Sequence, residues 1–359
     1  MARALISFGA RSLIYLFAFF PLFYLAYKFH VPDFGGTDYA HYHAMYLRPL
    51  DFSAADAPWV LRQIQAVLVN LVYEAGFDYD TDIAFAATGY ERGVFFSALT
   101  VNYLSVTLTA ALLGTFLHCQ ARQADLVSWC IPAVMVFNFS ILFFAFSGLT
   151  EGLSLLMFTA AYLAYRSGLP LIAALIILAA ALQRELIPIL FVALVFVDLI
   201  TGEPRRNKGR LLVLASATLS LCAHIALRLS LSNDPYGHQL SPQSLIDALA
   251  GFSFGNPEFI FQVFLTQNLA IIVLLATVMF MVATRRAPRV DRWLTRDLCV
   301  TFGVILFVGI AAAVGNNIGR LLIFCSPVLT IILASIAREW SSVLTAPIHR
   351  VPPASGPPA

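Results

Sequence analysis

Apolar residues occur along this chain in long runs, which short polar stretches separate. A helix that crosses a membrane needs about 20 predominantly apolar residues. Runs of roughly that length lie at 12–28, 94–117, 127–147, 150–165, 210–232, 259–284, 298–315 and 321–337. The pattern predicts an all-α polytopic membrane protein, with one membrane domain over 1–345 and a disordered, proline-rich cytoplasmic tail over 346–359.

The run from Leu169 to Ile200 does not fit this scheme. At about 30 residues it is too long for one ordinary crossing and too short for two. Arg184 and Glu185 stand in its middle, where charges in lipid are costly unless protein or water covers them. We therefore expect a hairpin of two short helices over 169–200, about 169–182 and 186–200, which meet at these charges.

The positions of the charged residues support the hairpin, and the composition indicates a membrane protein. Charged residues make up only 12% of the chain, and the mean hydropathy is +0.81. With the hairpin, the chain has about ten segments and both termini in the cytoplasm. This topology places 15 of the 22 basic residues in the cytoplasm, as the positive-inside rule requires. We expect a multi-pass protein of a bacterial inner (plasma) membrane, with membrane lipids around it and no nucleic acid as a partner.

The largest polar segment is the predicted first outer loop, 29–93. Gly35-Gly36 allows a tight backbone directly before Asp38, and Tyr39, His41 and His43 follow. Further along, the stretch from Trp59 to Tyr73 has apolar residues at helical spacing, interrupted by polar ones. This stretch is either a helix at the membrane interface or a packing helix with solvated polar positions.

Other charged residues also fall on the predicted outer side. An arginine fork matches phosphate oxygens, and a fixed cation stabilises a phosphate leaving group as charge develops on it. A site there can combine the Asp38 carboxylate with Arg184 or Arg320 as the phosphate ligand. The other outer-side candidates are Arg62, Glu91, Arg92, Glu151 and Glu185.

Several short motifs, taken in their order along the chain, carry a resemblance to a known family. They are Asp38 after the first span, Trp59 with Arg62-Gln63 and Leu71-Val-Tyr-Glu-Ala-Gly76, Thr150-Glu151-Gly-Leu153, Leu182-Gln-Arg184-Glu185, and Arg320-Leu-Leu-Ile-Phe-Cys-Ser-Pro327. In this order the chain resembles bacterial integral-membrane glycosyltransferases of the GT-C superfamily. The resemblance implies a polyprenyl-phosphate-linked sugar as donor and a glycan or lipid acceptor of the cell envelope.

The resemblance also implies roles for individual residues. Asp38 would be the catalytic base that deprotonates the acceptor hydroxyl. Arg184 and Arg320 would hold the donor phosphate, and Glu185 would orient Arg184. Glu151 would shape the substrate pocket, together with Arg62, Tyr39, His41, Glu91 and Arg92.

The chain departs from the family pattern at its first acid. Family members often carry paired acids there, whereas Asp38 is followed by Tyr39. No cofactor and no set of metal ligands is therefore expected. A divalent cation, Mg²⁺ or Mn²⁺, at Asp38, completed by Asp33 or His41, stays open.

Structural roles and other functions stay open as well. Arg184 and Glu185 can be a pair that closes a helix break, Asp38 can cap a turn, and Arg320 can snorkel at a span end. A polysaccharide polymerase also fits Gly36-Thr-Asp38-Tyr39. A transporter is a third class, because transporters use broken helices, but here the charges gather on one face instead of at the midplane.

Overall fold

The computed structural model describes residues 2–29, 38–76, 91–138 apart from 122 and 124, 140–201, 207–231 and 322–344, with positions 243, 246 and 257. In this part of the chain every regular element is a helix, so the all-α prediction is confirmed. The predicted spans 259–284 and 298–315, the tail 346–359, Asp33 and Arg320 lie outside the described residues.

The observed helices follow most of the predicted runs. Within the described residues, three helical stretches are long and apolar enough to cross a membrane, namely Ala2–Lys28, Arg92–Cys119 and Lys208–Ser230. The helices of the bundle are α1 (Ala2–Phe29), α4 (Arg92–Cys119), α5 (Asp125–Val136), η2 (Ile141–Ala145), α6 (Glu151–Arg166), α7 (Pro170–Ala179), η3 (Ala180–Leu182), α8 (Leu186–Thr201), α9 (Asn207–Ser230) and α15 (Cys325–Leu344). The count of about ten spans stays a prediction.

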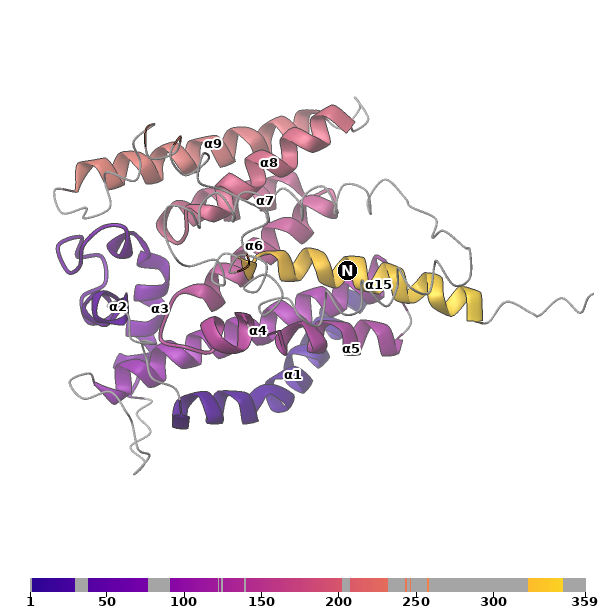
Figure 1. The fold of residues 1–359 in the computed structure, drawn as a ribbon, viewed down its shortest axis with the longest axis horizontal. Helices are drawn as coiled ribbons and strands as arrows, with labels where there is room; N and C mark the ends of the chain where they lie inside the picture. The colour runs from indigo at the N-terminus through magenta and orange to yellow at the C-terminus, as the bar shows by residue number, and fades with distance from the viewer. Residues whose placement is uncertain are drawn as a thin grey trace, which may run out of the picture.

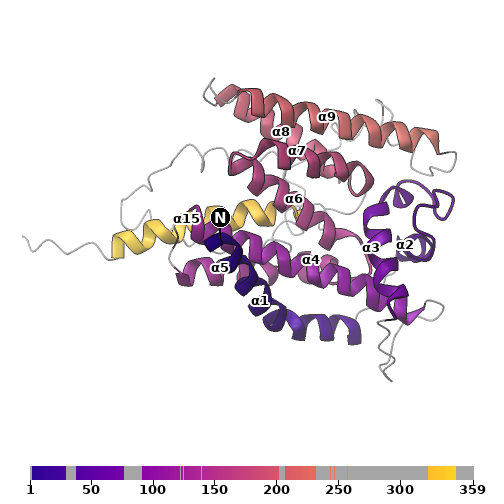
Figure 2. The ribbon, with the colours of Figure 1, turned by 180° about the vertical axis from the view of Figure 1, so that it is seen from behind.

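The helices stack in an order that places α4 inside the bundle. α1 packs on one side of α4 and α6 on the other, and α7 packs on α6. α9 then covers both α7 and α8, and α15 lies against α4 and α5. Figure 1 shows this order from α1 to α9, and the view from behind in Figure 2 agrees with it. A polar group on the inner side of α4 or α6 is therefore buried by neighbouring helices.

The run at 169–200 is a helical hairpin, as predicted. At its open end, Asp198 near the end of α8 accepts hydrogen bonds from Tyr165 at the end of α6 (2.5 Å) and from Arg210 at the start of α9 (3.2 Å). A Cβ on Gly209 would lie 3.1 Å from the ring of Pro170, so the start of α7 is at this end too. The start of α7 and the end of α8 therefore lie together, beside the end of α6 and the start of α9. The break between the two arms lies at the opposite end of the hairpin.

Arginine side chains lie at both ends of the bundle. Arg166 and Arg210 lie at the open end of the hairpin, whereas Arg62 and Arg184 lie at the end with the break. Arg11 is buried near the first of these ends, where it donates to the Ser128 carbonyl at 2.7 Å. The orientation of the two ends in a membrane stays a prediction.

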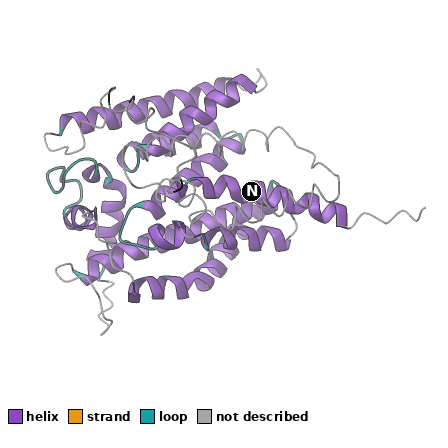
Figure 3. Cartoon of the chain, in the orientation of Figure 1, coloured by secondary structure: helices purple, strands orange, loops and turns teal. Residues whose placement is uncertain are grey.

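A small helical unit precedes α4, at the end of the bundle with the break. It contains α2 (Asp38–Leu47), η1 (Trp59–Leu61) and α3 (Gln63–Glu74), which teal loops join in Figure 3. α3 buries Gln63 and Gln65, while Leu68 and Leu71 are exposed. α3 is therefore a packing helix, but its polar positions Gln63 and Gln65 point inward and are not solvated. An exposed apolar face agrees with the predicted position at a membrane interface.

The contact between α4 and α6 depends on a glycine. Without a hydrophobic drive between helices in lipid, small residues let helix backbones approach closely. A Cβ on Gly152 would lie 2.6 Å from Oδ1 and 3.0 Å from Cα of Asn102. We expect Gly152→Ala to destabilise the protein by about 1–3 kcal/mol, because backbone must move. Gly9→Ala is the control, since its Cβ would meet nothing within 4 Å. Thermal unfolding in detergent measures both, and equal midpoints would contradict this packing.

Candidate active site

The break between η3 and α8 brings a buried ion pair to the start of α6. Arg184 and Glu151 are both buried, and Nη1 of Arg184 lies 2.6 Å from Oε1 of Glu151. Glu151 is the first residue of α6, where the helix dipole favours a negative charge. Removing one partner of such a pair leaves an uncompensated buried charge, which is strongly destabilising. The pair therefore fixes the break against α6.

Glu185 does not have the role of orienting Arg184 that we expected from the sequence. The contacts of Arg184 give the orienting role to Glu151, whereas Oε2 of Glu185 lies 3.7 Å from Nε2 of His224 in α9. Burial raises the pKa of the Glu185 carboxyl, but the charges of Arg62, His224 and Arg184 outweigh this and lower it to about 2. Glu185 is thus an anion throughout the physiological range and a poor proton acceptor.

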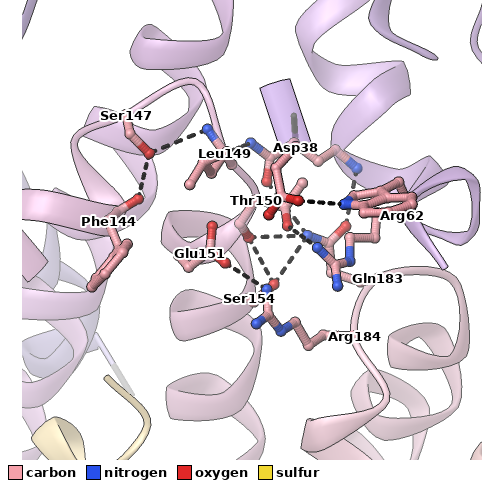
Figure 4. A network of polar contacts seen from close by, with 12 residues as sticks. Asp38, Arg62, Phe144, Ser147, Leu149, Thr150, Glu151, Ser154, Gln183 and Arg184 are labelled. Carbon is pink, nitrogen blue, oxygen red and sulfur yellow. Dashed lines mark hydrogen bonds and ion pairs between the residues drawn. The ribbon is translucent and has the colours of Figure 1, made fainter. Parts of the chain in front are cut away.

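A network of buried amides holds the break from the other side. Nε2 of Gln183 donates to Oγ of Ser154 at 3.1 Å, and its Oε1 accepts the backbone N–H of Gln65 at 3.1 Å. Nε2 of Gln65 donates to the Leu149 carbonyl at 2.7 Å, which Asn102 also contacts at 2.7 Å. Figure 4 shows Glu151, Ser154, Gln183 and Arg184 pointing toward one another. α3, α4, α6 and the break are therefore joined by one buried polar network.

Arg62 adds a second buried guanidinium to this cluster. It precedes α3, and its Nη1 donates to Oγ1 of Thr150 at 3.4 Å. Its guanidinium carbon also lies 5.5 Å from the ring centre of Tyr42, a cation–π distance. Arg62 contacts Thr150 and Arg184 contacts Glu151, so the two arginines bind neighbouring residues of one turn. Two cations are thus concentrated at the start of α6.

Asp38 reaches this cluster through Trp59. It is the first residue of α2, and its Oδ1 accepts a hydrogen bond from Nε1 of Trp59 at 3.0 Å. The His41 ring stacks on the Trp59 ring, and the two ring centres are 4.1 Å apart. Trp59 stands three residues before Arg62, so Asp38 and Arg62 flank the same short helical turn. The Asp38 carboxylate is therefore held by Trp59, at the same end of the bundle as Arg62.

The remaining predicted pocket residues lie toward the junction of α2, α3 and α4. Tyr39 is fully buried, and a Cβ on Gly148 would overlap its ring at 2.3 Å. Glu91 accepts the Tyr73 hydroxyl at 2.6 Å, and Arg92 begins α4 directly after it. Tyr39 and Tyr73 belong to the small helical unit before α4, and a role in substrate binding stays a prediction for Tyr39, Glu91 and Arg92. Burial by its neighbours makes Tyr39 part of the core.

Sequence reasoning missed three of the buried polar residues that complete the site, namely Gln65, Asn102 and His224. Each of the three residues has less than 5% of its surface exposed. Asn102 and His224 stand inside predicted apolar spans, and a polar or ionisable side chain inside a span marks a functional or structural contact. That signal was present in the sequence, but it did not reveal which neighbours these residues meet.

The fold and the site define an all-helical protein with apolar helices of membrane-spanning length and a charged cluster at one end. No protein-family model, curated protein or solved structure matches the chain. Within the described residues, no three or more His, Cys, Asp or Glu side chains are grouped to hold a metal ion. Chemically, buried arginines beside a fixed carboxylate suit an anionic group, above all a phosphate, next to a proton acceptor.

Proposed function

We propose that the protein is a membrane glycosyltransferase that moves a sugar from a polyprenyl-phosphate donor to a glycan or lipid acceptor. One observation carries this proposal. Four segments far apart in the sequence supply Asp38, Arg62, Glu151 and Arg184 to one end of the helix bundle. Carboxylate and arginines are the groups that acceptor activation and donor phosphate binding need.

In the proposed reaction, Asp38 takes the proton of the acceptor hydroxyl. The acceptor oxygen then forms a bond to the anomeric carbon of the sugar, while the bond from that carbon to the phosphate oxygen breaks. The bonding pair leaves with the carrier phosphate, whose added negative charge Arg184 and Arg62 stabilise. Trp59 holds the carboxylate by its 3.0 Å hydrogen bond. Arg320 stays a further candidate for the phosphate.

Glu151 prepares Arg184 for this role. The ion pair engages Nη1 of Arg184, while its Nε has no hydrogen-bond partner within the part of the chain that the structure describes. A guanidinium has five N–H donors in a planar fork, so donors remain for a phosphate oxygen after one is used by Glu151. A held fork loses less rotamer freedom on binding than a mobile one. The buried pair is thus a support for the phosphate ligand.

The occupant of the site can be mapped by photo-cross-linking with a polyprenyl phosphate that carries a diazirine beside the phosphate. We expect adducts on peptides that contain Arg62 and Arg184, and excess unmodified carrier should compete for them. Peptides from the exposed face of α1, such as those around Phe17, serve as the control for lipid contact. Adducts confined to that face would contradict a phosphate site at the break.

The proposal includes a membrane orientation with about ten spans, both termini in the cytoplasm and the site on the outer side of an inner membrane. Two exposed positions test it in a cysteine-free background, Ser53 in the small helical unit before α4 and Lys208 at the start of α9. We expect Ser53→Cys to react with an impermeant maleimide added to intact spheroplasts. Lys208→Cys should react only after the membrane is opened. The reverse pattern would overturn the orientation.

A further inference from the structure

Two buried glutamines join the two segments that carry the arginines of the site. Gln65 in α3 and Gln183 at the break are both fully buried. Oε1 of Gln183 accepts the backbone N–H of Gln65 at 3.1 Å, and its Nε2 donates to Oε1 of Gln65 at 3.4 Å. In the sequence, Gln65 follows Arg62 by three positions and Gln183 directly precedes Arg184. This reciprocal amide pair therefore connects the backbones on which the two guanidiniums stand.

Gln65 and Arg62 hold the same turn from α3. Nε2 of Gln65 donates to the Leu149 carbonyl at 2.7 Å, while Nη1 of Arg62 donates to Oγ1 of the next residue, Thr150, at 3.4 Å. Nδ2 of Asn102 in α4 also donates to the Leu149 carbonyl at 2.7 Å, so the turn is fixed to the centre of the bundle. The Gln65 side chain thus fixes the start of α3, and with it Arg62, against this turn.

Gln183 holds the other arginine against the same turn. Its Nε2 donates to Oγ of Ser154 at 3.1 Å and to the Thr150 carbonyl at 3.4 Å. Arg184, the next residue, pairs with Glu151 at 2.6 Å, and Figure 4 shows these contacts side by side. The break is therefore attached to α6 by a neutral amide and by an ion pair at adjacent positions. Loss of the amide contacts would free the backbone that carries Arg184.

The partners fix which way round each amide stands. A backbone N–H can only donate, and a carbonyl oxygen can only accept. The Gln183 atom that meets the Gln65 N–H is therefore the oxygen, and the Gln65 atom that meets the Leu149 carbonyl is the nitrogen. Each position needs a donor and an acceptor on one planar group, which neither a carboxylate nor an apolar side chain supplies. An uncharged pair also does not compete with a phosphate for the arginines.

We propose that Gln65 and Gln183 are positioning residues that set the spacing between Arg62 and Arg184, so that both guanidiniums contact one phosphate. The inference rests on the proposed function for the identity of that ligand, a lipid-linked phosphate. An arginine binds phosphate strongly where its planar fork is correctly directed. Two arginines on separate segments therefore need a rigid connection between those segments, and supporting hydrogen bonds provide it.

The affinity for the phosphate tests this role. The probe is a polyprenyl phosphate without a sugar, titrated into the purified protein in detergent. Gln65→Met keeps the size of the side chain but loses its hydrogen bonds, and we expect it to weaken binding about tenfold, the order of one hydrogen bond to a charged group. In the Arg62→Gln background the same change should alter the dissociation constant by no more than about twofold, because the spacing no longer matters.

Tyr15→Phe is the matched control. It removes a hydrogen bond between packed helices away from the site, from the Tyr15 hydroxyl in α1 to the Trp129 carbonyl in α5 at 2.8 Å. We expect a lower thermal midpoint, as for Gln65→Met, but the wild-type affinity. An equal loss of affinity from Gln65→Met with and without Arg62 would show that Gln65 does not act through the arginine. Wild-type affinity in a folded Gln65→Met protein would also overturn the proposal.

A milder variant serves if Gln65→Met does not fold. Ser154→Ala takes one acceptor from Nε2 of Gln183 and leaves its other contacts. We expect about threefold weaker binding of the polyprenyl phosphate, the order of one neutral hydrogen bond. In the Arg184→Gln background Ser154→Ala should have no effect on binding. Unchanged affinity with Arg184 present would contradict the role of Gln183.

Unfolding midpoints without any ligand separate this inference from the proposed function. Gln65→Met and Arg62→Gln release the same turn, so we expect the double variant to lose less stability than the sum of the two single variants. Additive losses would mean that Gln65 does not hold Arg62, and would overturn the inference. A wild type that binds no polyprenyl phosphate would refute the proposed function, while the midpoints would still decide whether the two residues are coupled.

Discussion

Asp38→Asn should lower the rate of sugar transfer by about 10²- to 10⁴-fold, the contribution of a positioned general base. Asparagine has the same shape, and its amide oxygen can still accept the hydrogen bond from Nε1 of Trp59 that Asp38 accepts at 3.0 Å. We therefore expect the fold and the donor affinity to be kept while kcat falls. Initial rates with a radiolabelled lipid-linked sugar measure the change, and thermal midpoints check the fold.

Asp51→Asn is the matched control for this substitution. Asp51 lies in the same small helical unit, where its carboxylate accepts hydrogen bonds from the backbone N–H and the hydroxyl of Ser53 and not from Trp59. We expect Asp51→Asn to transfer sugar at the wild-type rate. Normal transfer by a folded Asp38→Asn protein would remove Asp38 from the reaction and favour a structural role at the start of α2.

The second large effect concerns the buried pair of Arg184 and Glu151. Arg184→Gln should destabilise the protein by about 3–5 kcal/mol, because it leaves Glu151 buried without its 2.6 Å partner. It should also reduce kcat/KM for the donor roughly 10- to 100-fold, as expected when a charged hydrogen bond to phosphate is lost. Chemical denaturation measures the first effect and donor kinetics the second.

The double variant with Glu151→Gln and Arg184→Gln separates stability from donor binding. Two neutral amides leave no uncompensated buried charge, so we expect the double variant to regain most of the lost stability. Donor use should stay as low as in Arg184→Gln alone. If donor use recovered with stability, Arg184 would be a structural residue that closes the break, which is one of the alternatives that the sequence left open.

Much of the fold could be predicted from apolar run length and charge placement. The hairpin at 169–200 followed from a run of the wrong length with charges in its middle, and the break is found at Gln183 to Glu185. The run at 127–147 was predicted as one span, but α5 ends at Val136 and a short π-helical turn begins at Ile141. Apolar composition does not show where a helix ends, so this interruption was hidden. Spans outside the described residues stay predictions.

The residues of the site could be predicted from the sequence, but the contacts between them could not. Asp38, Arg62, Glu151 and Arg184 were all candidates, and all four lie at one end of the bundle. The sequence placed Glu185 beside Arg184 because the two are adjacent, yet adjacent residues at a helix break point in different directions. Glu151, 33 positions earlier, became the partner through the packing of α6 against the break. Such pairings depend on three-dimensional packing.

The most direct test of the account is to incubate the purified protein with polyprenyl-phosphate monosaccharides that carry a radiolabelled sugar. The measured quantity is the label that leaves the lipid, by transfer to an acceptor or by slow hydrolysis. We predict release by the wild type and none above background by Asp38→Asn, and a parallel reaction with a chelator decides whether a divalent cation takes part. No release from any monosaccharide donor would contradict the proposed transferase and favour a polymerase that uses diphosphate-linked oligosaccharides.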